Sequence, residues 1–229
     1  MTGYTREDWE SRLPSEIAFW QSLIDGTHKN KEWVADMRRR VAGTAPFNGL
    51  FCRYLKPAGA GTTRILDVGA GPVSVICPAM APTPITVTAI DPLADVYNDL
   101  LHNAGLEPAV RTQKGEAERL SELGIGPFDL VYSRNALDHS YDPIRAIREM
   151  VLVCAPDGVV VIEGAVNESL NAQAQGLHQW NFMPLDNGDL VIWTPDYTAY
   201  SLRAALDGMA SVDARNNKWY CVEIRPLPQ

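Results

Sequence analysis

Alternating strand-like and helix-like stretches organise the chain from about residue 60 onward. Short runs rich in apolar and β-branched residues predict strands at 64–69, 85–91 and 128–133. A continuous apolar run at 158–163 predicts a strand that is buried on both faces. Between such runs, apolar residues recur at helical spacing, as they do from 92 to 103. This alternation predicts an α/β fold in which helices cover both faces of a doubly wound sheet.

Weaker signals complete the predicted sheet. A short strand is expected near 108–112 and a last strand near 219–224. Asp142 followed by Pro143 predicts the start of a helix, because proline is well suited to the first helical turn. A threonine-proline pair predicts another helix over 194–208, which a glycine ends.

The first sixty residues predict a separate helical region. Helices are expected over 13–24, 30–43 and 45–55, each with a glycine or proline at or just beyond its end. We therefore expect residues 1–60 to form an N-terminal helical cap and residues 61–229 to form the main domain.

One stretch of the main domain interrupts the alternation. Two runs that contain apolar and aromatic residues, 179–183 and 189–193, flank the dipeptide Asn187-Gly188, which favours a tight turn. We expect an inserted β-hairpin over about 178–193. Its mixture of Trp, Phe, His and Asn side chains predicts an exposed wall for a partly polar ligand.

A glycine turn at the end of the first predicted strand is the strongest chemical signal. Gly69 and Gly71 lack the Cβ atoms that would keep a ligand away from the backbone. Asp91 ends the next predicted strand, 24 positions after Asp67, where a carboxylate can accept hydrogen bonds from ribose hydroxyls. This pairing predicts a site for a cofactor that contains a nucleoside.

Asp67 decides which nucleoside cofactor the turn favours. A carboxylate just before the glycines would repel a pyrophosphate but attracts a ligand with an ammonium or sulfonium group. A dinucleotide fingerprint also wants a glycine where this chain has Ser74. S-adenosyl-L-methionine is therefore favoured, and a nicotinamide-dependent oxidoreductase is the disfavoured alternative.

Five motifs, in order and spacing, resemble those of class I S-adenosylmethionine-dependent methyltransferases. They span about 63–164, with a weaker likeness over the last thirty residues. The resemblance implies a Rossmann-like, mostly parallel seven-stranded sheet whose last strand is antiparallel. The motifs are Ile65-Leu-Asp-Val-Gly-Ala-Gly, Asp91-Pro-Leu, Gly115-Glu-Ala-Glu, Phe128-Asp-Leu-Val-Tyr-Ser and Ala155-Pro-Asp-Gly-Val-Val-Val-Ile-Glu.

The resemblance also implies which residues hold the cofactor. In this family the glycine turn holds the methionine part, the acid after the second strand binds the ribose, and the third motif lies by the adenine. Carried over to this chain, the expected cofactor-binding residues are Asp67, Gly69, Ala70, Gly71, Asp91, Pro92, Glu116, Ala117 and Ser133.

Candidates for acceptor chemistry follow the fourth predicted strand and precede the hairpin. Ligands of doubly wound sheets bind beyond the carboxyl ends of the strands, which places the segment after Ser133 beside the cofactor. His139 and His178 are the candidate bases, because an imidazole accepts protons near neutral pH. The expected acceptor contacts are Arg134, Asn135, Asp138, Trp180 and Asn181.

A metal site is considered and not predicted. Asp138, His139 and Asp142 carry suitable oxygen and nitrogen ligands. Their spacing matches no metal motif, however, and Asp142 is better explained as a helix cap before proline.

Composition narrows the class of partner. The 229 residues carry a net charge of −8, which repels phosphate backbones and anionic lipid. The acidic N-terminus lacks the pattern of a signal peptide, and no apolar run is long enough to span a membrane. We expect a cytoplasmic protein that binds a small molecule rather than nucleic acid or a membrane, with a homodimer left open.

The hypothesis is thus a methyltransferase that acts on a small polar acceptor, with a hydroxyl as the expected methylated group. The N-terminal helix followed by this domain resembles methyltransferases of sugar or glycoconjugate metabolism, and a natural-product O- or N-methyltransferase is the close variant. A non-catalytic S-adenosylmethionine-binding module is the main alternative, because the glycine turn and Asp91 would suffice for it.

Overall fold

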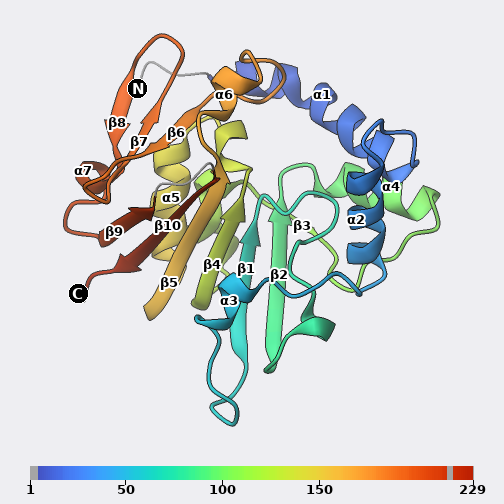
Figure 1. Cartoon of the computed structure of the whole chain (residues 1–229), viewed down its shortest axis with the longest axis horizontal. Helices are drawn as coiled ribbons and strands as arrows, with labels where there is room; N and C mark the ends of the chain where they lie inside the picture. The colour runs from blue at the N-terminus through green and yellow to red at the C-terminus, as the bar shows by residue number, and fades with distance from the viewer. Residues whose placement is uncertain (1–4, 216–218, 229) are drawn as a thin grey trace.

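The computed structural model describes residues 5–215 and 219–228, and it is built around one twisted sheet (Figure 1). The strand order is β3-β2-β1-β4-β5-β10-β9, and the first five of these run parallel. β10 lies antiparallel between β5 and β9. The predicted fold class is confirmed. The strands are β1 (Thr63–Val68), β2 (Ile85–Asp91), β3 (Gln113–Lys114), β4 (Phe128–Arg134), β5 (Cys154–Ala165), β9 (Ala210–Arg215) and β10 (Trp219–Pro226).

The central strands are apolar on both faces because both faces are covered. Leu66 and Val131 belong to a core cluster that includes the apolar side of α5 (Pro143–Leu152). Their neighbours Ile65 and Leu130 belong to a second cluster on the opposite face, which includes Phe51 of α3 (Gly49–Cys52). Alternating side chains along one strand thus enter different cores, which explains the continuous apolar runs.

Of the helices in the first sixty residues, the first two lie at the carboxyl ends of the central strands, whereas α3 packs on one face of the sheet. α1 (Arg6–Ile24) begins earlier than predicted, because Thr5 and Asp8 form a reciprocal capping box. α2 (Lys31–Val41) follows Asn30, whose side chain accepts hydrogen bonds from two backbone N–H groups. The other helical segments are α3 (Gly49–Cys52), η1 (Pro78–Met80), α4 (Ala94–Asn103), η2 (Ala117–Leu123), η3 (Leu137–His139), α6 (Glu168–Asn171) and α7 (Leu202–Ala205). No helix in the described ranges is both long enough and apolar enough to cross a membrane.

The predicted hairpin is present and belongs to a second, three-stranded sheet. β6 (Asn181–Pro184) pairs with β7 (Leu190–Trp193), and β7 pairs with β8 (Ala199–Ser201). Strand β8 occupies part of the range 194–208, so the helix predicted there is wrong except for α7.

A tight turn before β8 explains that error. The Thr194 N–H donates to the Thr198 carbonyl, and the Asp196 carboxylate accepts from the Thr198 N–H. Tyr197 has a φ of 66°, in the left-handed region. These local bonds turn the chain back along β7 instead of starting a helix.

The hairpin faces the core rather than a ligand. Trp180 is only 1% exposed, and Phe182, Leu190 and Ile192 are buried in the same cluster as α5, β9 and β10. The Trp180 indole N–H donates to the Ser140 carbonyl at 2.8 Å. The expectation that the hairpin exposes its aromatic side chains is therefore wrong for Trp180 and Phe182.

We predict that Trp180→Ala lowers the free energy of unfolding by about 3–5 kcal/mol, because it removes a buried ring and leaves a cavity. Chemical denaturation monitored by circular dichroism measures the change. Met183→Ala is the matched control, because Met183 lies on β6 and is 36% exposed. A loss in Trp180→Ala no larger than in Met183→Ala would show that the hairpin is not part of the core.

Candidate active site

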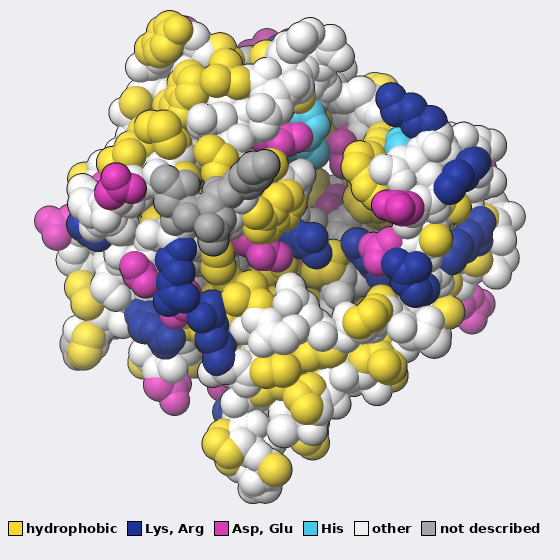
Figure 2. Space-filling model, viewed as in Figure 1, with side chains coloured by type: hydrophobic (Ala, Val, Ile, Leu, Met, Phe, Trp, Pro, Cys, Tyr) yellow, Lys and Arg dark blue, Asp and Glu magenta, His cyan; other side chains and the backbone are white. Residues whose placement is uncertain are grey.

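A cavity of about 430 Å³ opens at the carboxyl ends of the central strands. Its walls come from α1 and α2 on one side and from the segments after β1, β2 and β4 on the other. Figure 2 shows a hollow on this face with histidine, acidic and basic side chains around it. Trp9, Trp20 and Trp33 of the N-terminal helices all line the cavity. Its size lies within the range of small-molecule and cofactor sites.

The glycine turn forms the floor of this cavity. Gly69 and Gly71 have φ values of +69° and +63°, which side-chain-bearing residues rarely adopt. A Cβ on Gly71 would lie 2.8 Å from the Trp20 ring, and one on Gly69 would lie 2.5 Å from the Ala136 Cβ. Both positions thus need glycine for packing against α1 and the segment after β4, as well as for the approach of a ligand.

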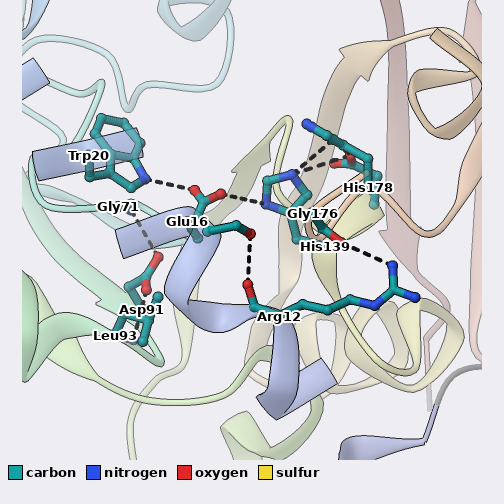
Figure 3. Close-up of polar contacts among 11 residues, drawn as sticks. Arg12, Glu16, Trp20, Gly71, Asp91, Leu93, His139, Gly176 and His178 are labelled. Carbon is teal, nitrogen blue, oxygen red and sulfur yellow. Dashed lines mark hydrogen bonds and ion pairs between the residues drawn. The ribbon is translucent and has the colours of Figure 1, made fainter. Parts of the chain in front are cut away.

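Asp91 is held rigidly at the edge of the turn. One carboxylate oxygen accepts from the Gly71 N–H at 3.0 Å, and the other accepts from the Leu93 N–H at 2.9 Å (Figure 3). Burial raises the pKa of Asp91 to about 6, although these two bonds oppose the shift. Each oxygen retains a lone pair for a ligand hydroxyl.

Asp67 is the second buried carboxylate in the wall. Burial raises its pKa to about 6, and a 2.6 Å hydrogen bond from the Ser74 hydroxyl and the positive charges of Arg40 and Arg134 oppose that shift. Ser74 also accepts from the Ile76 N–H at 3.0 Å, so it has a structural role at the position where a dinucleotide fingerprint would have glycine.

The third motif lies along one side of the cavity, but not all of it reaches the interior. Ala117 and Glu118 line the wall, as does Pro92. Glu116 instead accepts from Arg6 of α1 at 2.6 Å and from the Tyr141 hydroxyl at 3.0 Å. Glu116 therefore ties α1 to this wall.

Asp138, His139 and His178 come together, although 39 residues separate the two histidines. His178 Nδ1 lies 2.7 Å from Asp138 Oδ2 and 3.0 Å from His139 Nε2. Burial alone would lower the pKa of His178, but the bond to Asp138 raises it above its usual value. Both histidines line the cavity, while Asp138 is 3% exposed and lies behind them.

Glu16 of α1 connects this cluster to the cofactor side. One of its carboxylate oxygens accepts from the Trp20 indole at 2.8 Å, and the other lies 3.8 Å from His139 Nδ1 (Figure 3). Arg12, one turn earlier, donates to the Gly176 carbonyl at 3.1 Å. No local signal in the sequence marks Glu16 as a site residue, because its partner His139 is distant along the chain.

The remaining predicted site residues divide between the cavity and the core. Arg134 and Asn135 line the cavity, and the Arg134 guanidinium lies 5.3 Å from the centre of the Trp219 ring. Ser133 is buried, and Trp180 and Asn181 are buried in the hairpin without lining the cavity. Trp180 and Asn181 therefore cannot contact an acceptor in this conformation.

Sequence comparison identifies the central part of the chain. Residues 66–162 match the family model described as a methyltransferase domain. A ubiquinone biosynthesis O-methyltransferase of Caulobacter sp. (strain K31) is 31% identical over 144 residues, which cover 62% of this chain and 50% of the relative. A protein of the same name from Pseudomonas aeruginosa (strain LESB58) is 33% identical over 46% of this chain and 45% of its own length. The chain thus spans about half the length of the curated relatives that it matches.

Solved structures share the fold at low sequence identity. A Burkholderia thailandensis 1,6-didemethyltoxoflavin-N1-methyltransferase, solved with bound 1,6-didemethyltoxoflavin and S-adenosylhomocysteine, is 17% identical with a TM-score of 0.53; the match covers 100% of this chain and 93% of that one. A putative S-adenosyl-L-methionine-dependent methyltransferase of Methanococcus maripaludis is 13% identical with a TM-score of 0.50, over 100% and 98% of the two chains. Together with the glycine turn and its two carboxylates, the match to the family model identifies residues 66–162 as a methyltransferase domain similar to those of class I S-adenosylmethionine-dependent methyltransferases.

Proposed function

We propose that this chain transfers a methyl group from S-adenosylmethionine to a hydroxyl group of a small polar acceptor. One observation carries the proposal: the glycine turn with its two carboxylates and the Asp138–His139–His178 cluster line or adjoin the same cavity. The names of the sequence relatives, which are O-methyltransferases, support oxygen as the accepting atom. A sugar, glycoconjugate or natural product carrying such a hydroxyl is the proposed acceptor.

The cofactor fits the charges of the cavity. Asp67 and Asp91 are buried carboxylates in its wall, and Glu16 and Glu118 add further acidic groups. This environment favours a ligand with an ammonium and a sulfonium group over a polyphosphate. We assign Asp91 to the ribose hydroxyls, Asp67 to the amino group and Ala117 to the adenine side. Bound S-adenosylmethionine supplies an electrophilic methyl group on its sulfonium.

The chain contributes orientation, exclusion of water and control of one proton. Trp9, Trp20 and Trp33 cover the cavity from the N-terminal helices and limit the access of water. Holding the acceptor oxygen in line with the methyl group can supply roughly 7–11 kcal/mol in favourable cases. A hydroxyl must also lose its proton, and we assign that task to the cluster that contains His139 and His178.

The first test of this function is cofactor binding. Asp91→Ala should weaken S-adenosylhomocysteine binding by roughly 1.5–3 kcal/mol, because it removes the acceptor for the ribose hydroxyls and releases the Gly71 N–H. Titration calorimetry gives the change. Asp95→Ala is the control, because Asp95 is exposed and pairs with Lys114. Equal affinities of Asp91→Ala and wild type for S-adenosylhomocysteine would contradict the assignment of Asp91 to the ribose hydroxyls.

Cofactor affinity should also depend on pH. The raised pKa values of Asp67 and Asp91, about 6, mean that both carboxyls are partly protonated in mildly acidic buffer. Because folding raises the pKa of these two carboxyls, their protonation stabilises the folded protein. That stabilisation is fully present below about pH 4 and is lost as pH rises through 6. A cationic ligand favours the ionised form, so affinity should rise from about pH 5 to about pH 7 with release of protons.

Calorimetry in two buffers of different ionisation enthalpy measures that proton release. Asp67→Asn should flatten the pH dependence, whereas Asp95→Asn should leave it unchanged. An unaltered profile in Asp67→Asn would show that Asp67 does not respond to the ligand.

Methyl transfer is tested with labelled S-adenosylmethionine and a panel of hydroxylated acceptors. His178→Ala should lower turnover by about 100-fold or more, with S-adenosylhomocysteine affinity changed only a few-fold. His102→Ala, at an exposed position on α4, is the control. A loss below about tenfold would mean that the cluster does not control the acceptor proton. Cofactor binding without transfer to any acceptor would instead favour a non-catalytic binding module.

A further inference from the structure

Three potential metal-ligand atoms form a small triangle beside the cavity. Asp138 Oδ2, His139 Nε2 and His178 Nδ1 are separated by 2.7, 3.0 and 3.5 Å. Across residues 5–215 and 219–228, this is the one group of at least three His, Cys, Asp or Glu side chains with ligand atoms this close together. The triangle joins η3 to the segment that precedes β6.

Hydrogen bonds among these three atoms cannot give each of them a good partner. A proton on His178 Nδ1 can point to the Asp138 carboxylate, but His139 Nε2 then shares the same donor. A second proton on His139 Nε2 would place two N–H groups 3.0 Å apart. A divalent cation between the three atoms would attract all of them at once.

The dimensions of the triangle suit a transition metal. Zinc bonds of about 2.0–2.2 Å in tetrahedral geometry separate neighbouring ligand atoms by about 3.3 Å. The observed separations of 2.7–3.5 Å bracket this value, so side-chain shifts of a few tenths of an ångström would complete the site. Two imidazoles and one carboxylate favour a first-row transition metal over magnesium or calcium, which prefer oxygen ligands.

We infer that Asp138, His139 and His178 form a two-histidine, one-carboxylate binding site for a divalent transition metal. Sequence reasoning considered Asp142 as the third ligand and predicted no site. The structure gives Asp142 another role, because its carboxylate accepts from the Arg145 N–H at 3.0 Å and caps α5. The third ligand is His178, supplied by a segment that folds back onto η3.

The surroundings hold the ligands in place. The Asp138 carbonyl accepts from the Gln179 N–H at 3.0 Å and the Trp180 N–H at 3.3 Å, which fixes His178 beside η3. On the far side of His139, Glu16 Oε2 lies 3.8 Å from Nδ1. This separation is that of an ion pair rather than a hydrogen bond. A small shift would bring the carboxylate within hydrogen-bond distance of Nδ1, where such a group orients a ligating imidazole and strengthens its basicity.

The remaining coordination positions would face the cavity, because both histidines line it and Asp138 lies behind them. An acceptor hydroxyl bound there would lose its proton more readily, since a bound cation lowers the pKa of an oxygen ligand. This role rests on the proposed function, whereas metal binding itself does not. Coordination would make the histidines ligands rather than free proton acceptors, so the proton released from the hydroxyl would pass to bulk water.

Cobalt(II) is the probe, because its visible spectrum reports coordination directly. The full chain is treated with a chelator, desalted and titrated with Co²⁺, and Zn²⁺ is then added in competition. We expect one Co²⁺ per chain, with bands typical of four or five ligands, displaced by Zn²⁺. Binding should weaken by about 100-fold or more in His178→Ala and His139→Ala, and by about 10- to 100-fold in Glu16→Gln.

Controls separate loss of the site from loss of the fold. His102→Ala should bind Co²⁺ as the wild type does, and His178→Ala and His139→Ala should still bind S-adenosylhomocysteine. His178→Cys, which offers a thiolate, should restore binding with an additional charge-transfer band. No stoichiometric Co²⁺ binding, or binding unchanged in both His178→Ala and His139→Ala, would overturn the inference.

Methyl transfer distinguishes this inference from the proposed function. Full turnover in chelator-treated, metal-free protein would overturn the catalytic role of the metal and leave the methyltransferase function intact. Stoichiometric Co²⁺ binding without methyl transfer to any acceptor would support the metal site and count against the proposed function.

Discussion

The bonds from Gly71 and Leu93 to the Asp91 carboxylate are the constraint on which the site depends. They hold the glycine turn against the end of β2. Because Gly71 has no side chain, the Trp20 ring of α1 can pack directly against the turn. Trp20 in turn bonds to Glu16, which reaches the cluster at His139. One set of contacts thus runs from the cofactor turn, through α1, to the acceptor side. Moving α1 would disturb both ends together.

The cost of this arrangement is electrostatic. Asp67, Asp91 and Glu118 are buried, and burial raises the pKa of each by disfavouring its charged form. Backbone N–H groups and the Ser74 hydroxyl offset only part of that penalty. A cationic ligand would supply the missing compensation, so the cavity is better suited to the ligand-bound state than to the free one. Such storage of unfavourable charge is common at functional sites.

Sequence patterns predicted those features that local chemistry determines. The central strands, the glycine turn and the hairpin closed by Asn187-Gly188 follow from residue type and spacing. The helix predicted over 194–208 failed because side-chain bonds of Asp196 and Thr194 favour a turn there. The contact of His178 with Asp138, and the core position of Trp180, depend on pairing between distant segments. The hydrophobic pattern of a single segment cannot predict such contacts between distant segments.

The hairpin shows why core and site residues in such an insertion are hard to separate by sequence. His178 and Trp180 are two positions apart, yet one lines the cavity and the other is sealed in the core. The buried ring of Trp180 and its bond to Ser140 anchor the strand at the end of η3, and that anchor brings His178 to Asp138. Loss of the core side chain would therefore displace the ligand side chain as well. Point substitutions that face the cavity can test the chemistry, whereas deletion of the hairpin would remove structure and chemistry together.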